Sequence, residues 1–217
     1  GVLAKLGLSH ETLLQANPGI ILASISSQGE TGPDAQFVSF GSTLEAMGGL
    51  AWRTGYAGGP PVISGNDLNF PDQVAAIFAA AMICVAIGSV RAGASGVHLD
   101  LSQRELTSFL SGEAFTELPS ITSERRLGNH DPLYLLQDCL ADRDGRWVAL
   151  SVRAADLPAI ARCIGVELAS VPDEPLLRSR LHDWIGTRAA TEVVPALQEA
   201  GIAAAPVQGG MQVLQTL

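Results

Sequence analysis

The feature that most constrains the fold of this chain is an uninterrupted apolar run at residues 74–87, preceded by Pro71 and Asp72. A proline and an acid at these positions are typical of the first turn of a helix, and the Gly-rich turn at residues 91–96 ends it. The run of fourteen residues falls short of the ~20 that a helix needs to cross a bilayer. We therefore expect a helix buried in the core of a soluble protein and no contact with a membrane.

The flanking segments predict the strands and helices of an α/β fold. Residues 20–25 are an apolar run of strand length, expected to be buried on both faces, and residues 97–101 alternate apolar with polar side chains. A polar, Gly-rich loop at residues 26–33 follows the first strand, where open α/β sheets bind ligands. Helices are expected at residues 10–16 and 41–47 and from the capping box of Ser102 and Glu105 onward.

Residues 111–132 form the clearest break in composition, because they contain few apolar side chains in no sustained period. They predict a linker. After it, residues 133–207 predict a smaller α+β unit, which begins with a hairpin around the turn at residues 142–145. The later elements of this unit are expected to be helices near residues 157–164, 174–185 and 191–200 and a short strand at 202–207.

The charge balance limits the ligands of this chain. Thirteen Lys and Arg against 22 Asp and Glu give a net charge of −9, which argues against nucleic acid or an anionic membrane as a partner. Because Lys5 is the only lysine, an anion-binding site has to use arginines or backbone amides. The widely spaced Cys84, Cys139 and Cys163 predict reduced thiols in the core of a cytoplasmic protein, and the four histidines lack metal-ligand spacing, which predicts no metal site.

The residue pattern leaves the reaction open. Asp72 either complements the helix dipole, by about 0.3–1 kcal/mol, or is a carboxylate kept ionised as a nucleophile. Asp67 is a rival carboxylate and equally a turn former, while Gly128 and Asn129 form either a plain turn or a ligand contact. The chain has no Gly-x-Ser-x-Gly nucleophile elbow and no P-loop, so hydrolase and mononucleotide-binding motifs are absent.

A series of short segments in a fixed order gives further information on the function of the chain. They are NPGII at 17–21, GETGP at 29–33, AMGGL at 46–50, TG at 54–55, GPP at 59–61, PD at 71–72, LDLSQRE at 99–105, GN at 128–129, DGRWVA at 144–149 and AGIAAAPV at 200–207. Each segment alone is weak, but together they span nearly the whole chain. In this order they resemble the class III CoA-transferase family, which includes the carnitine and formyl-CoA transferases.

The resemblance implies an architecture. Residues 1–110 would be part of a Rossmann-like large domain, residues 111–132 a linker, residues 133–207 a small α+β domain, and residues 208–217 the start of a segment that returns to the large domain. It also implies an interlocked homodimer in the cytoplasm. Members of the family are substantially longer than this chain, which begins at Gly1 without an initiator methionine and is expected to be a fragment or a truncated copy.

The resemblance also implies a reaction. Coenzyme A would move from an acyl-CoA donor to a carboxylic acid acceptor through a thioester on Asp72, with neither metal nor ATP. The residues that it places at the substrate or CoA are Gly32, Phe40, Gly59, Gly128 and Asn129, the last two in a covering loop. Two positions depart from the family pattern: the turn at residues 91–96 lacks its Thr and one Arg, and Ala76 replaces a common Gly.

Two alternatives stay open. An α-methylacyl-CoA racemase of the same superfamily would use a His-Asp pair, whose histidine follows the Gly-Pro motif. The corresponding stretch here, residues 39–42, is SFGS and has no histidine. The other alternative is a truncated, non-catalytic remnant that acts as an interaction module.

Overall fold

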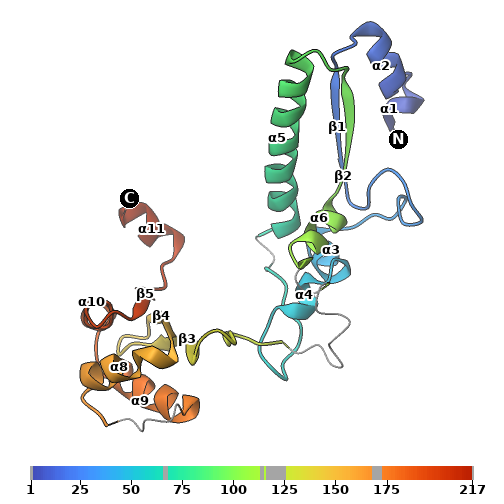
Figure 1. The fold of residues 1–217 in the computed structure, drawn as a ribbon. Helices are drawn as coiled ribbons and strands as arrows, with labels where there is room; N and C mark the ends of the chain where they lie inside the picture. The colour runs from blue at the N-terminus through green and yellow to red at the C-terminus, as the bar shows by residue number, and fades with distance from the viewer. Residues whose placement is uncertain (1, 66–67, 113–114, 116–125, 168–172, 217) are drawn as a thin grey trace. The chain divides into compact units, whose positions relative to one another are not determined.

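The chain has a mixed α/β fold that divides into two compact units, Gly1–Arg126 and Leu127–Leu217 (Figure 1). The computed structural model describes residues 2–65, 68–112, 115, 126–167 and 173–216. The domain boundaries predicted from the sequence stay predictions, and the predicted linker falls largely outside the described residues.

The first unit is built on a parallel strand pair. β1 (Ile21–Ser26) pairs with β2 (Val97–Ser102) in a register that runs from Ile21 opposite Val97 to Ser26 opposite Ser102. The helices of this unit are α1 (Val2–Lys5), α2 (His10–Ala16), α3 (Gly41–Met47), α4 (Leu50–Arg53), α5 (Phe70–Arg91) and α6 (Gln103–Phe109). Because the strands are parallel and end together, the loop after β1 and the helix after β2 leave the sheet at the same edge (Figure 1).

Side-chain caps explain where two of these helices begin. The Ser9 hydroxyl accepts a hydrogen bond from the Thr12 N–H at 3.3 Å, and the Ser102 hydroxyl accepts one from the Glu105 N–H at 3.2 Å. The predicted helices at 10–16 and after Ser102 are therefore confirmed. The strand predicted at 20–25 is confirmed within one residue, but its burial on both faces is wrong, since Ile25 is 49% exposed.

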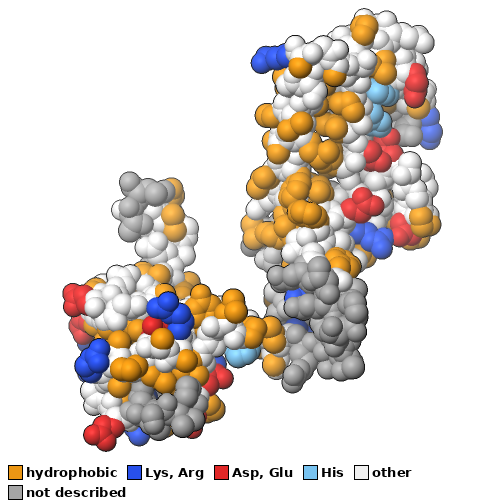
Figure 2. Space-filling view, in the orientation of Figure 1, with side chains coloured by type: hydrophobic (Ala, Val, Ile, Leu, Met, Phe, Trp, Pro, Cys, Tyr) orange, Lys and Arg blue, Asp and Glu red, His pale blue; other side chains and the backbone are white. Residues whose placement is uncertain are grey.

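The long apolar helix is confirmed as α5, but the expectation that it is buried is wrong for one side of it. Its buried residues, which face the rest of the first unit, are Pro71, Val74, Ala75, Ala79 and Ala86. The opposite side carries Ile77 and Val85, which are 71% and 70% exposed, and Cys84, which is exposed rather than in a core. Figure 2 shows the resulting line of apolar side chains along α5. The elements on which α5 packs, β1, β2, α3 and α6, leave this side of the helix uncovered.

The helix α5 runs close to the bounds predicted for it, from Pro71 to the turn at residues 91–96, and is longer than the apolar run alone. The helix has 22 residues, because it extends beyond the apolar run at both ends, and its mean hydropathy is 2.2 in the most apolar window. By length and composition alone it is the one helix in the described part of the chain that could cross a membrane. Core helices of soluble proteins can share this length and composition; α5 packs on both β1 and β2, and 22% of its most apolar window is buried.

The second unit is an antiparallel sheet covered by helices. β3 (Leu136–Ala141), β4 (Trp147–Val152) and β5 (Ala203–Pro206) lie in that order, and the hairpin predicted around residues 142–145 joins the first two. The helical elements are η1 (Ala154–Asp156), α8 (Leu157–Ile164), α9 (Glu174–Gly186), α10 (Ala190–Glu199) and α11 (Gly210–Thr216). Alternating residues of β3 and β4 enter one core with α8, α9 and α10. The predicted helices and last strand are confirmed here.

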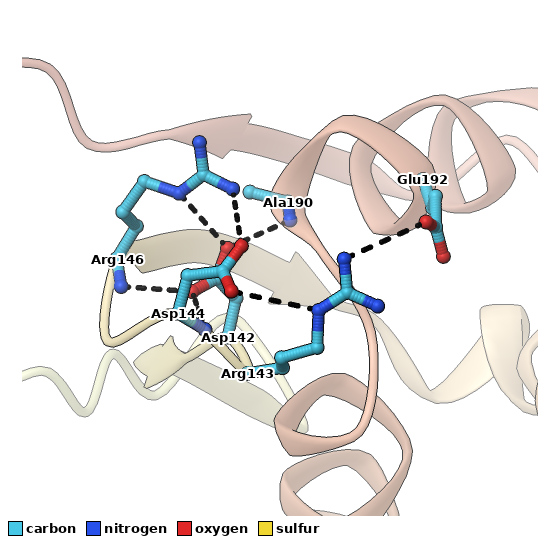
Figure 3. Close-up of polar contacts among 6 residues, drawn as sticks. All are labelled: Asp142, Arg143, Asp144, Arg146, Ala190 and Glu192. Carbon is cyan, nitrogen blue, oxygen red and sulfur yellow. Dashed lines mark hydrogen bonds and ion pairs between the residues drawn. The ribbon is translucent and has the colours of Figure 1, made fainter.

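The β3–β4 turn is fixed to the α10 N-terminus by Asp142 (Figure 3). The Asp142 carboxylate accepts backbone N–H bonds from Asp144, Arg146 and Ala190, each at 2.8 Å. The Arg146 guanidinium adds an ion pair at 3.2 Å. Burial alone would raise the pKa of Asp142, but the hydrogen bonds from Ala190, Arg146 and Asp144 and the Arg146 charge together lower it below its ordinary value of 3.8.

We expect the second unit to lose stability as the pH falls below about 4. A carboxyl whose pKa is lowered by folding stabilises the folded state above its unfolded pKa, and that contribution disappears as acid protonates it. Thermal unfolding of wild type and Asp142→Asn at pH 7, 5 and 3.5 checks this. The variant is expected to be less stable at pH 7, with a difference that shrinks at pH 3.5. Asp144→Asn, in the same turn but half-exposed, is the matched control, and an equal loss in it would contradict the assignment.

Candidate active site

Asp72 is the third residue of α5, and its side chain is exposed. The preceding Pro71 is buried and supplies no backbone N–H, which suits the first turn of a helix. Among the described residues, one side chain hydrogen-bonds to the Asp72 carboxylate: the Gln103 amide donates from Nε2 to Oδ1. The helix start predicted from the sequence is confirmed, and the structure adds a donor that sequence reasoning missed.

Gln103 is held in place by the start of α6. Ser102 caps this helix, and the buried Thr107 hydroxyl donates to the Gln103 carbonyl at 2.8 Å. α6 packs against α5 through an edge-to-face contact of Phe109 and Phe78, whose ring centroids are 5.5 Å apart. The backbone that carries the Gln103 amide is therefore fixed relative to the helix that carries Asp72.

The turn before α5 is fixed by α3. The Glu45 side chain is 3% exposed and accepts hydrogen bonds from the Ser64 N–H, at 2.9 Å, and from the Ser64 hydroxyl. That hydroxyl also lies 2.8 Å from the Leu68 carbonyl, so its single hydrogen is shared between the two acceptors or serves one of them. Glu45 thus ties α3 to the segment that leads into Asp72. Sequence reasoning missed Glu45, although an acid between Leu44 and Ala46 in a short apolar helix is a usable signal.

Phe40 lies beside this turn. It precedes Gly41, and a Cβ at Gly41 would come within 2.6 Å of the Asn69 side-chain oxygen. A larger residue at position 41 would displace the Asn69 side chain, so the start of α3 lies in close contact with the residue before α5. Phe40 itself is 77% exposed and caps α3 without a side-chain hydrogen bond. The structure thus brings Phe40, among the residues predicted to bind substrate, to the same end of α5 as Asp72.

The loop that carries Gly32 is anchored to β2 and α6. The Asp100 carboxylate accepts the Glu30 N–H at 3.0 Å, and Arg104 forms an ion pair with Asp34 at 2.5 Å. Gly32 has a φ of +96°, a conformation that favours glycine, and open space on its side-chain side. This loop leaves the edge of the sheet from which Gln103 also emerges. A role of Gly32 in binding stays a prediction.

Gly59 lies in a loop tied to α4 by Arg126. The guanidinium donates to the Gly59 carbonyl and, at 3.1 Å, to the Trp52 carbonyl, and it stacks 4.9 Å from the Trp52 ring centroid. No hydrogen bond among the described residues joins Gly59 to Asp72. Its assignment to the thioester site stays a prediction.

Gly128 and Asn129 belong to the second unit. Gly128 has a φ of +61°, and the Asn129 amide donates to the Asp138 carboxylate at 2.9 Å. This hydrogen bond ties the loop of Asn129 to β3. The role of Gly128 and Asn129 in covering the substrate, which the resemblance implies, stays a prediction. The rival carboxylate, Asp67, lies outside the described residues.

The surroundings of Asp72 leave its carboxylate accessible for a reaction with substrate. The described residues contain no group of three or more His, Cys, Asp or Glu side chains placed to hold a metal ion. Asp72 offers an exposed carboxylate with one oxygen bonded to a neutral donor and the other without a hydrogen bond among the described residues. A carboxylate in this arrangement can act as a nucleophile or as a base.

The family is settled by the sequence as a whole. The sequence model of a family described as CoA-transferase family III matches residues 1–216. The chain belongs to CoA-transferase family III. The family predicted from the ordered short segments is thereby confirmed. Substrates that contain coenzyme A are typical of this family.

Relatives of this CoA-transferase family III chain include enzymes that exchange CoA between acids. It is 26% identical over 220 residues to the acetyl-CoA:oxalate CoA-transferase of Acetobacter aceti, covering 95% of this chain and 56% of that protein. It is 32% identical over 175 residues to the succinyl-CoA–D-citramalate CoA-transferase of Chloroflexus aurantiacus, covering 79% and 43%. The chain therefore spans about half the length of these curated relatives.

A solved structure agrees on the fold. A CAIB/BAIF family protein from Brucella suis superposes with a TM-score of 0.84 at 24% identity, covering 99% of this chain and 60% of that one. This likeness supports the mixed α/β fold over the whole of the chain. At this identity it shows the fold alone and carries no assignment of substrate.

Proposed function

We propose that this chain is the part of a family III CoA-transferase that supplies the nucleophile, and that Asp72 forms the covalent intermediate. The observation that carries the proposal is the Asp72 carboxylate, exposed at the start of α5 with an amide donor on Oδ1. Membership of the family and relatives that transfer CoA between acids support it. The substrates are proposed as a class, an acyl-CoA donor and a carboxylic acid acceptor.

The proposed reaction conserves the thioester. Asp72 attacks the acyl carbon of the donor, the C–S bond breaks, and a mixed anhydride and CoA thiolate result. The thiolate attacks Cγ of Asp72 and expels the donor acid, which leaves an aspartyl thioester. The acceptor acid repeats the exchange in reverse order, so that Asp72 is regenerated and a new acyl-CoA leaves. No net proton, electron or phosphate is consumed.

The test is covalent trapping in the full-length protein that contains this chain. It is incubated with acetyl-CoA or succinyl-CoA without acceptor and treated with hydroxylamine, which converts an aspartyl thioester to a hydroxamate. Peptide mass spectrometry is expected to find the modification on the peptide that begins the long helix, at Asp72. Modification of Asp67, or of neither residue with any donor of a broad panel, would overturn the assignment.

A second incubation, with a branched acyl-CoA in deuterated solvent, separates the alternatives. A racemase exchanges the α-proton of a branched acyl-CoA with deuterium from solvent without an acceptor acid, whereas the proposed transferase turns over only when an acceptor is present. The stretch at residues 39–42 leads into α3 through Phe40 and has no histidine, which favours the transferase. A non-catalytic remnant forms no adduct and no product in either assay.

We also propose, on the resemblance alone, that the active protein is a cytoplasmic homodimer. Light scattering of the full-length protein after size exclusion is expected to give twice the mass of one chain. A monomer that is fully active would contradict this proposal without affecting the role of Asp72.

A further inference from the structure

We infer that Gln103 is a catalytic residue of the proposed transfer: its amide N–H binds the oxygen of Asp72 that becomes negatively charged whenever the Asp72 carbonyl is attacked. This inference rests on the proposed function of Asp72. It is carried by the hydrogen bond from Gln103 Nε2 to Asp72 Oδ1, between two residues 31 positions apart.

The chemistry of the two groups fixes the direction of this bond. An ionised carboxylate can only accept, and of the two ends of the Gln103 amide only the NH2 group can donate. The amide therefore bonds through Nε2. Its oxygen, Oε1, carries partial negative charge and would be repelled by Asp72 Oδ1. Because Oδ1 is engaged, Oδ2 is the oxygen left to attack the donor acyl carbon.

The bond strengthens at the point where the reaction needs it. In the mixed anhydride and in the aspartyl thioester, Oδ1 is a neutral carbonyl oxygen. When CoA thiolate attacks Cγ, the C–S bond forms and the carbonyl electron pair moves onto Oδ1, which becomes an oxyanion. Collapse of that oxyanion breaks the Cγ–Oδ2 bond and releases the donor acid. Attack by the acceptor acid on the thioester creates the same oxyanion, so one donor serves both halves of the exchange.

The surroundings of Gln103 meet the requirement that such a donor be placed before the reaction. Its main chain is held by the Thr107 bond at 2.8 Å and by the Ser102 cap. Its neighbour Arg104 is bonded to Asp34 at 2.5 Å, and the Phe78–Phe109 contact joins α5 to α6. A donor fixed in this way needs little reorganisation as charge develops on its partner.

The test compares Gln103→Leu and Gln103→Glu with Gln73→Leu in the full-length protein. Gln103→Leu removes the donor at similar size, and Gln103→Glu keeps the shape but replaces the donor with an acceptor. Gln73 is an exposed amide next to Asp72 whose side chain makes no hydrogen bond to another described residue, which makes it the matched control. The melting temperature of each variant is measured first. If Gln103→Leu does not fold, Gln103→Glu decides, because wild-type rates in this variant, which lacks the donor, would overturn the inference.

We expect Gln103→Leu to lower kcat by about 10²-fold, with KM for the acyl-CoA changed by less than about threefold. In single-turnover experiments, formation and decay of the aspartyl thioester are expected to slow by similar factors, which a merely structural role would not produce. Gln73→Leu is expected to retain wild-type rates. Wild-type rates in Gln103→Leu, or a change confined to KM, would overturn this inference.

The two proposals fail separately. If the wild-type protein gives no adduct on Asp72, the proposed function is wrong and Gln103 has no carbonyl to act on. If the wild-type adduct forms and Gln103→Leu makes and consumes it at the wild-type rate, Asp72 remains the nucleophile and the role of Gln103 alone is refuted.

Discussion

Replacing Asp72 with asparagine in the full-length protein is expected to lower the transfer rate by at least about 10³-fold and to abolish the hydroxylamine-trapped adduct. An amide of the same shape keeps the Oδ1 acceptor but lacks the negative charge and nucleophilicity needed to attack a thioester. The first turn of α5 keeps its proline, so the helix is expected to form as before.

The measurement for Asp72 is the rate of acyl-CoA formation with a saturating acceptor acid. The matched control is Asp67→Asn, which changes the rival carboxylate five positions earlier and is expected to stay within about threefold of wild type. Retained activity in Asp72→Asn together with loss in Asp67→Asn would reverse the assignment. A melting temperature unchanged by Asp72→Asn excludes unfolding as the cause of lost activity.

Gly96→Ala is expected to destabilise the first unit by about 3 kcal/mol or more. An added Cβ would come within 2.0 Å of the Ile20 carbonyl oxygen and 2.6 Å of the Ile20 nitrogen. Both are backbone atoms at the start of the strand pair, where the Gly96 N–H also donates to the Pro18 carbonyl at 2.7 Å. Side-chain rotation cannot relieve that overlap, so β1 and β2 have to separate.

Hydrogen exchange of the full-length protein, followed by peptide mass spectrometry, checks the Gly96 prediction. Protection is expected to fall in peptides of β1 and β2 and to stay unchanged in β3 and β4, which belong to the other unit. Gly88→Ala is the matched control, because Gly88 lies in α5 with no atom within 4 Å of an added Cβ. That change is expected to stabilise the helix by roughly 0.5–1 kcal/mol. Equal effects of the two substitutions would contradict the steric argument.

Most elements of this chain could be predicted from its sequence because their signals are local. Ser9 and Ser102 cap their helices through the next few residues, and Gly165 ends α8 with a φ of +70°, a conformation that favours glycine. The hairpin follows from the turn at residues 142–145. In each case the deciding hydrogen bond or backbone angle lies within about four residues.

Burial was harder to predict than secondary structure. An apolar run indicates that a helix packs against other elements, but it does not indicate which side of the helix is buried. In α5 one side packs on β1, β2, α3 and α6, while Ile77 and Val85 lie on the other side and stay exposed. The same reason accounts for Cys84, which was expected in a core and lies on the exposed side.

In the candidate site, too, one residue could be predicted from the sequence and its partners could not. The place of Asp72 after Pro71 and before the apolar run fits both a helix-dipole residue and a nucleophile, and the resemblance to the family made it the predicted nucleophile. Gln103 and Glu45 could not be assigned to it, because their contacts cross long stretches of sequence: Gln103 reaches Asp72 over 31 positions and Glu45 reaches Ser64 over 19. No local pattern encodes such a contact.

The sequence by itself determined the family and the long helix whose first turn holds Pro71 and Asp72, since these depend on short-range chemistry and on the order of motifs. The tertiary structure decided which donor the carboxylate meets. Parallel pairing of β1 with β2 brings the start of α6 to the carboxyl edge of the sheet, and packing of α6 on α5 then places the Gln103 amide against Asp72. That contact exists only when the strands and both helices are assembled.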